Sequence, residues 1–261
     1  MFDNNLRGMI DDVKDGRLDR RAFVKRMIAV GLTAPMANQI LSLGGVAMAQ
    51  SPNPYKPTKR GGGGPLKLLW WQGPTLLNPH FATGTKDQDG SRIFYEPLAS
   101  WDVDGHLNPI LAAEIPSIQN GGLSADAKSV TWKLKPGVKW HDGKPFTSAD
   151  VKCTFDMLMG KSPQKFRQNP RKSWYDQVDE VTTNGDDEAS FKLKRPQPAL
   201  LSLLASGYSP VYPCHVSPAE MRTKPVGTGP FKFVEFKANE SIKLTKNPDY
   251  FKKGLPHLDG I

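Results

Sequence analysis

Apolar and polar residues alternate near the middle of the chain, and this alternation predicts a β-strand. Val130, Trp132 and Leu134 are separated by polar residues, which is the two-residue period of a strand with one buried face. Lys135-Pro136-Gly137 ends the strand. A short extended piece follows, and His141-Asp142-Gly143 then has the Asp-Gly chemistry of a left-handed turn. We therefore expect a strand followed by a tight turn in this region.

A helix is predicted directly after this turn. Thr147 is a good N-cap residue, and Asp150 stands three positions later, as in a capping box. Val151, Phe155 and Leu158 then recur at the spacing of one helical face. The pattern predicts a helix that begins at Thr147 and buries this apolar face.

The rest of the chain after residue 65 also alternates between strand and helix patterns. The nearly continuous apolar run from Leu66 to Trp71 predicts a strand buried on both faces. The strand patterns and the helix patterns together indicate a mixed α/β (α+β) fold. The further expected elements are a helix over 87–95, a strand pair over 178–183 and 190–193 joined across Asn184-Gly185, a helix over 198–205, and two strands around Phe231–Phe236 and Ile242–Leu244.

Residues 1–49 look like an export signal of the twin-arginine type. Arg20 and Arg21 precede a mildly apolar stretch that is too polar to span a bilayer stably. Ala49 ends this stretch at a small-residue site, so cleavage before Gln50 is expected. The alternative is an amphipathic helix that merely contains two arginines. The export signal predicts a periplasmic or otherwise extracytoplasmic protein that passes through the twin-arginine translocase.

Residues 50–65 are predicted to be a disordered linker. The stretch from Ser51 to Gly64 contains three prolines and the four consecutive glycines Gly61 to Gly64, and it has too little apolar surface to form a packed core. Its composition therefore separates the export signal from the folded part of the chain.

Charge and cysteine content narrow the function classes. The chain has 35 Lys+Arg and 26 Asp+Glu, a net charge of +9, but the positive residues are scattered rather than gathered with aromatics, so nucleic-acid binding is disfavoured. Cys153 and Cys214 are the two cysteines of the chain. An oxidising compartment would permit a bridge, yet nothing in the sequence brings them together, and two free or buried thiols are the default expectation.

The sequence offers little support for an enzyme. His141 and Asp142 are neighbours in a turn and should point apart, and no motif places a serine or cysteine nucleophile. The five histidines lack zinc-ligand spacing, so neither a metal nor a cofactor is expected.

Gly227-Thr228-Gly229 is a poor phosphate loop, and we expect it to let the chain pass close to a neighbouring backbone. Four tryptophans in strand patterns are predicted to be core residues, although Trp71 could face a cleft: Trp70, Trp71, Trp132 and Trp140.

Five blocks of sequence, in order and approximate spacing, resemble one family. The blocks are Leu77-Asn78-Pro79-His80, Tyr95-Glu96-Pro97-Leu98, residues 137–151, Pro225 to Phe231 and Ile242 to Tyr250. They are similar to the signature of family 5 extracellular solute-binding proteins, the receptors of peptide, nickel and related ABC importers. The resemblance implies a type II periplasmic-binding-protein lobe, an oligopeptide-like ligand and delivery to an inner-membrane ABC permease. The alternative from another class is a secreted hydrolase on a similar mixed sheet, and a third is a chaperone-like protein without a small ligand.

The resemblance also implies a domain layout. Residues 66–97 and 181–261 would form lobe I around a mixed sheet, with residues 98–180 inserted as a smaller subdomain. Family members run to roughly twice this length, so the chain looks like an N-terminal half without the second lobe, either as a fragment or as a truncated gene. Peptides, nickel chelates, opines, sugars and haem all remain possible ligands.

Two short segments are the candidate ligand contacts. By resemblance, the loop after the first strand would meet a peptide through its backbone, and Gly84 would let the ligand lie close. An arginine and two aromatic residues would face this loop from the smaller subdomain, although a solvated loop and surface aromatics are an equally good reading. The residues are Thr83, Gly84, Thr85 and Lys86 in the loop, and Arg171, Trp174 and Tyr175 opposite it.

Overall fold

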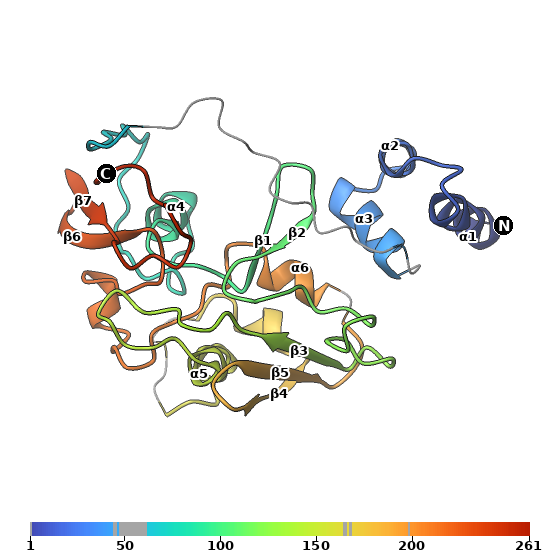
Figure 1. Cartoon of the computed structure of the whole chain (residues 1–261). Helices are drawn as coiled ribbons and strands as arrows, with labels where there is room; N and C mark the ends of the chain where they lie inside the picture. Colours follow the sequence, from blue (N-terminus) through green and yellow to red (C-terminus); the bar gives the residue numbers. More distant parts are fainter. Residues whose placement is uncertain (1, 44–45, 47–61, 164–165, 167–168, 198) are drawn as a thin grey trace. The chain divides into compact units, whose positions relative to one another are not determined.

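The computed structural model describes the chain except for residues 1, 44–45, 47–61, 164–165, 167–168 and 198. The chain divides into two compact units, each treated separately below. One unit comprises Met1–Lys56 with Trp101–Asn108, and the other comprises Pro57–Ser100 with Pro109–Ile261. Figure 1 follows their elements along the chain.

Three short helices make up most of the described part of the first unit. They are α1 (Phe2–Lys14), α2 (Arg20–Ala29) and α3 (Ala34–Leu43). Their buried apolar side chains form a small core of Ile10, Phe23, Met27, Ala37 and Leu41. Among the described residues, no helix is both long and apolar enough to cross a membrane.

The export motif lies at the start of α2. Arg20 Nε donates a hydrogen bond to Asn38 Oδ1 at 3.3 Å, whereas the side chain of Arg21 is 84% exposed. The predicted cleavage residues Ala49 and Gln50, and most of the predicted linker, lie outside the described residues. The export signal and the linker therefore stay predictions.

A three-stranded antiparallel sheet forms the centre of the second unit. Its strands are β3 (Ser129–Lys133), β4 (Val178–Asn184) and β5 (Glu188–Leu193), in the order β3-β5-β4. Val130 and Trp132 are buried, as their alternation predicts, and Gly185 has the positive φ of the predicted hairpin turn. Two further sheets are small: β1 (Ala99–Trp101) pairs with β2 (Leu107–Pro109), and β6 (Phe231–Lys237) pairs with β7 (Ser241–Lys246).

The longest helix of the second unit, α5 (Ser148–Met159), packs on this sheet. The capping box between Thr147 and Asp150 is present, and the face that carries Phe155 is buried. The Phe155 and Phe191 rings meet at 4.7 Å between centroids, which joins helix and sheet into one core. The remaining helices are α4 (Thr85–Arg92), α6 (Leu200–Leu204) and two 3₁₀ turns, η1 (Lys172–Tyr175) and η2 (Glu220–Arg222).

The predicted boundary between lobe I and the inserted subdomain falls inside a strand. Residue 180 lies within β4, and β4 pairs with β5, which in turn pairs with β3. One sheet thus combines residues from both sides of the predicted boundary. The division into 66–97 with 181–261 and 98–180 stays a prediction.

The expectation of a buried strand over Leu66–Trp71 is wrong. Within the described chain, Leu66 alone of these residues has a backbone hydrogen bond, from its N–H to Gly260 O at 2.9 Å, and none of the six belongs to a strand. Trp70 and Trp71 are 52% and 69% exposed, so they are not core residues, whereas Trp132 and Trp140 are buried as expected. The run is apolar enough for a buried strand, but in the described part of the chain no strand pairs with residues 67–71.

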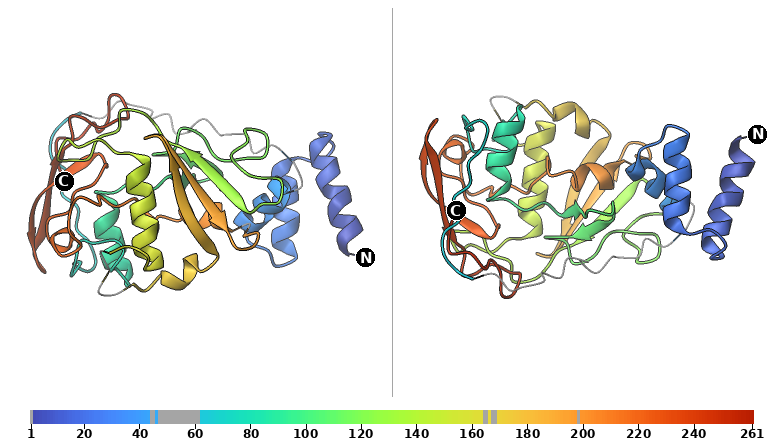
Figure 2. Two further views of the ribbon diagram at one scale, coloured as in Figure 1. Left: turned by 90° about the horizontal axis from the view of Figure 1, so that it is seen from below. Right: turned by 90° about the horizontal axis from the view of Figure 1, so that it is seen from above.

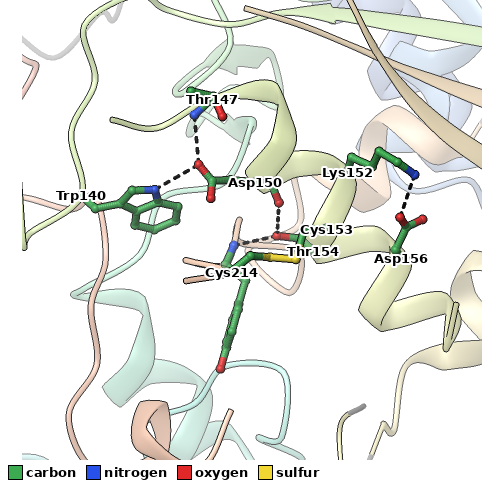
Figure 3. Close-up of a disulfide and its surroundings, with 9 residues drawn as sticks. Trp140, Thr147, Asp150, Lys152, Cys153, Thr154, Asp156 and Cys214 are labelled. Atoms are coloured by element: carbon green, nitrogen blue, oxygen red, sulfur yellow. Dashed lines mark hydrogen bonds and ion pairs between the residues drawn. A yellow bond between two sulfur atoms is a disulfide. The ribbon is translucent and has the colours of Figure 1, made fainter. Parts of the chain in front are cut away.

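Free thiols were the default expectation for the two cysteines, and this is also wrong. Cys153 on α5 forms a disulfide with Cys214, with 6.2 Å between their Cα atoms (Figure 3). Next to it, Thr154 Oγ1 donates to Asp150 O and accepts the Tyr212 N–H. These bonds bring the Pro-flanked loop of Cys214 onto α5, a contact between segments far apart in the sequence.

The step Gly227-Thr228-Gly229 passes close to a neighbouring backbone, as predicted. A Cβ on Gly227 would lie 1.8 Å from Phe94 O, and one on Gly229 would lie 2.7 Å from the same atom. His141 holds this step from its other side, because its Nδ1 accepts the Gly227 N–H and its Nε2 lies 2.9 Å from Gly229 O. Burial is the main reason that the pKa of His141 falls to about 4. The turn is therefore a structural contact with a neutral histidine.

Candidate functional site

The predicted ligand loop leads into the first turn of α4. Gly84 is the N-cap residue, and its carbonyl accepts the N–H groups of Asp87 and Gln88 at 3.2 and 3.1 Å. Thr83 and Thr85 on either side are exposed, and no atom lies within 4 Å of a Cβ built on Gly84. The helix thus fixes the loop while one face of its backbone stays open.

The turn before this loop is held by two side chains. Gln88 Nε2 donates to Pro79 O at 3.2 Å and to Ala82 O at 2.9 Å. The Arg171 guanidinium donates to the same two carbonyls, from NH1 to Pro79 O at 3.2 Å and from NH2 to Ala82 O. Residues 79–82, which lead directly into the predicted loop, are therefore tied both to α4 and to the segment just before η1.

Lys86 is not free to reach outward. Its Nζ lies 3.2 Å from Thr75 Oγ1 and 3.4 Å from Asp87 Oδ1, and its side chain is 19% exposed. Asp87 in turn accepts the Thr75 N–H at 2.6 Å. Lys86 therefore helps to hold the loop start, and the exposed threonines are the better placed of the loop residues for outside contacts.

The three predicted residues near η1 have different environments. Arg171 is only 5% exposed, and its guanidinium carbon lies 5.6 Å from the Trp174 ring and 5.1 Å from the Tyr208 ring. Burial lowers the pKa of Arg171. Trp174 is 41% exposed and packs edge-on against Tyr208 at 5.9 Å. Tyr175 is buried, donating to or accepting from Ser209 Oγ at 2.7 Å.

Arg171 therefore joins the two predicted segments, and Trp174 lies exposed beside it. Tyr175 belongs to the core, where burial raises its pKa to about 12 and keeps its hydroxyl protonated. Arg92, at the end of α4, adds a second guanidinium 5.3 Å from the Tyr208 ring. Tyr208 was not a predicted site residue, and the sequence around it has no signal that singles it out. The assignment of the seven residues to a ligand stays a prediction.

A buried polar network that sequence reasoning also missed lies beneath the loop. His80 Nε2 is 3.0 Å from Pro210 O, and the His80 N–H donates to Asn78 Oδ1 at 3.0 Å. Asn78 Nδ2 reaches the Tyr212 hydroxyl at 3.2 Å. Burial first, and then the charge of Arg171, lower the pKa of His80 to about 3. The block Leu77-Asn78-Pro79-His80 resembles a family motif, and its polar residues Asn78 and His80 are buried hydrogen-bonding groups.

These groups do not form a metal centre. Within the described part of the chain, no three His, Cys, Asp or Glu side chains gather as metal ligands. His80 and His141 bond to main-chain groups, whereas Asp142 Oδ2 lies 2.6 Å from His215 Nε2. His141 and Asp142 thus point to different partners, as predicted. The exposed groups near the predicted loop are Thr83 and Thr85, the Trp174 ring and the Arg92 side chain.

Comparisons with known proteins identify the family of the chain. The family model for bacterial extracellular solute-binding proteins, family 5 middle region, matches residues 106–261. The oligopeptide-binding protein AppA of Bacillus subtilis is 34% identical over 198 residues, which are 72% of this chain and 34% of that protein. The glutathione-binding protein GsiB of Pectobacterium atrosepticum is 32% identical over 194 residues, 72% of this chain and 35% of that protein.

Solved structures give the same result. The structure of AppA from Bacillus subtilis in complex with a nonapeptide has a TM-score of 0.63 and 31% identity, covering 78% of this chain and 40% of that one. The periplasmic binding protein AgaA of A. tumefaciens R10, in complex with agropinic acid, has a TM-score of 0.64 and 28% identity, covering 72% and 37%.

The matched part of the chain thus spans about a third of the length of the curated relatives. The fold is the expected mixed α/β fold, shared with part of the type II periplasmic binding proteins, although its sheets are three small ones. The chain belongs to family 5 of the bacterial extracellular solute-binding proteins.

Proposed function

We propose that the chain is part of the extracytoplasmic substrate-binding component of an ABC importer that captures an oligopeptide-like solute and delivers it to an inner-membrane permease. It would reach its compartment through the twin-arginine translocase. Capture requires no chemistry on the ligand, because contacts that stabilise the ligand-bound form are sufficient. Relatives named as oligopeptide-binding and glutathione-binding proteins support this ligand class.

The observation that carries the proposal is the position of Arg171. Its two bonds to Pro79 O and Ala82 O, and its position 5.6 Å from the exposed Trp174 ring, support a site that combines this ring with the open loop at residues 83–85. An extended peptide presents backbone groups that can bond to such a loop, and apolar side chains that can pack on an indole. The exposed guanidinium group of Arg92 adds positive charge toward an anionic group of the ligand.

Binding can be measured directly on the purified chain. We expect short peptides, from tripeptides to nonapeptides, to cause saturable shifts of the backbone amide signals of Thr83, Gly84 and Thr85, and to be recovered unchanged. Trp174→Ala should weaken this binding about five- to tenfold, roughly 1–1.4 kcal/mol, because one face of ring packing is lost. Trp71→Ala, which removes a 69% exposed ring outside this site, is the matched control and should leave the affinity unchanged.

The outcomes separate the alternatives. Equal affinity in Trp174→Ala and the unsubstituted chain would refute the site assignment alone. Cleavage of the peptide, or a covalent adduct with an activity probe, would instead support the secreted hydrolase. A complete lack of saturable binding would contradict the transport proposal and favour a chaperone-like protein.

A further inference from the structure

The hairpin turn between β4 and β5 supports two neighbouring elements through its carbonyl groups. Ser148, the first residue of α5, donates from its Oγ to Gly185 O at 2.6 Å and from its N–H to Asp186 O at 2.7 Å. The Leu134 N–H, just after β3, donates to Asp187 O at 2.7 Å. In both views of Figure 2 the yellow-green helix α5 lies beside the strands of this sheet. The start of α5 and the end of β3 therefore depend on the position of this turn.

The turn begins with an Asn-Gly pair whose reactive groups are free. Gly185 has a φ of 63° and lacks the Cβ that would shield its nitrogen. Among the described residues, the Gly185 N–H has no hydrogen-bond acceptor. Asn184 is exposed, and the one hydrogen bond that its side chain makes in this part of the chain runs from Nδ2 to Glu188 Oε1 at 3.2 Å. Neither the Gly185 N–H nor Asn184 Oδ1 is therefore tied to another group of the described chain.

The sequence contains one other Asn-Gly pair, Asn120-Gly121, and the structure holds it in place. Asn120 Oδ1 accepts the N–H groups of Ser117 and Gly122 at 2.9 and 3.0 Å, and its Nδ2 donates to a main-chain carbonyl at 2.9 Å. The Gly121 N–H donates to Ile118 O at 3.2 Å. The same two residue types thus occur once with every reactive group bonded and once with the nitrogen and the carbonyl oxygen open.

We propose that Asn184 is a modification site, at which the side-chain amide is converted to a carboxylate by its own backbone. The Gly185 nitrogen attacks Asn184 Cγ, so that a new C–N bond closes a five-membered imide ring. The bond from Cγ to Nδ2 breaks, and Nδ2 leaves as ammonia with the proton that the Gly185 nitrogen loses. Water then opens the ring at either carbonyl, which gives aspartate or isoaspartate. Water is the only co-reactant, and no electrons are exchanged.

The modification changes both the charge and the backbone of the turn. Residue 184 pairs with Glu188 in the register of the hairpin, and like charges directly opposite each other destabilise a strand pair. Isoaspartate also adds a methylene group to the backbone between residues 184 and 185. Gly185 O and Asp186 O then no longer lie where Ser148 donates. The modified hairpin therefore supports α5 less well, and Tm falls.

Peptide mapping of the folded chain after incubation at mildly alkaline pH tests the site. Trypsin places Asn120 and Asn184 on separate peptides, which end at Lys128 and Lys192. The Asn184 peptide should lose ammonia and yield two products of equal mass, aspartate and isoaspartate, about tenfold faster than the Asn120 peptide reacts, because the Asn120 pair must first open locally. In chains kept unfolded in guanidinium chloride, which are the control, both pairs should react at similar rates.

Asn184→Gln is the matched variant, since glutamine keeps the amide but would have to close a six-membered ring, which forms more slowly. Its Tm should stay constant during incubation, whereas the Tm of the unsubstituted chain should fall as isoaspartate accumulates. Equal rates for both pairs in the folded chain, or faster reaction of Asn120, would overturn the site. An unchanged Tm after full conversion of residue 184 would overturn the role of the turn in holding α5. The mapping experiment needs no variant, so it decides the site even where the substitution disturbs the hairpin.

Discussion

Two histidines, the buried His80 and the half-buried His141, hold main-chain groups of this fold. His80 bonds to Pro210 O beneath the candidate loop, and His141 bonds to the main chain of Gly227 and Gly229. Burial lowers their pKa values to about 3 and about 4. Both rings are therefore neutral when the chain is folded at neutral pH, and each serves as a hydrogen-bonding group of the interior.

The sign of the resulting pH dependence follows from proton linkage. In the unfolded chain a histidine has a pKa of about 6.5, so between that pH and about 3 the unfolded state binds a proton at residue 80 that the folded state does not. The stabilising contribution of neutral His80 is therefore fully present above about pH 6.5. It is lost progressively as the pH falls toward 3.

His80→Gln should flatten this dependence. We expect the free energy of unfolding, from urea titrations, to fall less steeply between pH 6 and pH 4 in the variant, by up to one proton, or about 1.4 kcal/mol per pH unit. Glutamine can still donate to Pro210 O, and a comparison at pH 8 isolates any cost of altered packing. An unchanged slope would show that His80 does not carry the linkage.

At the scale of the elements, the disulfide is the strongest constraint on α5. It links Cys153 to Cys214, which are 61 positions apart in the sequence. Such a link restricts the unfolded chain, and its removal typically costs about 2–4 kcal/mol of stability. The capping box and the buried face of α5 are local and do not depend on it.

The variant Cys153→Ser/Cys214→Ser should therefore fold but unfold at a lower urea concentration. A loss of about 2–4 kcal/mol is expected from unfolding titrations. A reductant provides the matched control, since it should destabilise the unsubstituted chain to a similar degree and leave the double variant unaffected. Equal stability of both proteins without reductant would refute this role of the disulfide.

Local patterns predicted the elements whose determinants lie within a few residues of one another. The capped helix α5, the alternating strand β3 and the turn at Gly185 are of this kind. Residues 66–71 and the cysteine pair were misread because burial and pairing depend on segments far away in the chain. Pattern alone does not supply such partners.

The candidate site shows the same limit. Family resemblance nominates the loop, and the charges beside Trp174 nominate that ring, but neighbouring Tyr175 is a core residue. The partners of Arg171 are carbonyls 92 and 89 positions away, which no local pattern encodes. Tyr208 carried no motif at all. A sequence can therefore nominate such a site, while the division between structural and exposed residues requires the fold.

At the scale of the whole molecule, the proposed export route gives the sharpest test. Replacing Arg20 and Arg21 together by lysine should leave the precursor in the cytoplasm, because the twin-arginine motif is lost while charge is kept. Cell fractionation with N-terminal sequencing checks this, and Arg26→Lys in the same helix is the control. Mature protein that begins at Gln50 outside the inner membrane would contradict the twin-arginine route.

The carbonyls of Pro79 and Ala82 each accept hydrogen bonds from both Gln88 and Arg171, and this has a thermodynamic consequence for ligand capture. Fixing the backbone of one mobile residue costs about 1–2 kcal/mol in conformational entropy, and a flexible binding loop adds that cost to every binding event. In this chain the entropy of residues 79–82 is already lost on folding, because Gln88 and Arg171 donate four hydrogen bonds that immobilise the segment leading to the loop. A ligand that meets residues 83–85 would then lose affinity mainly through the ordering of its own chain.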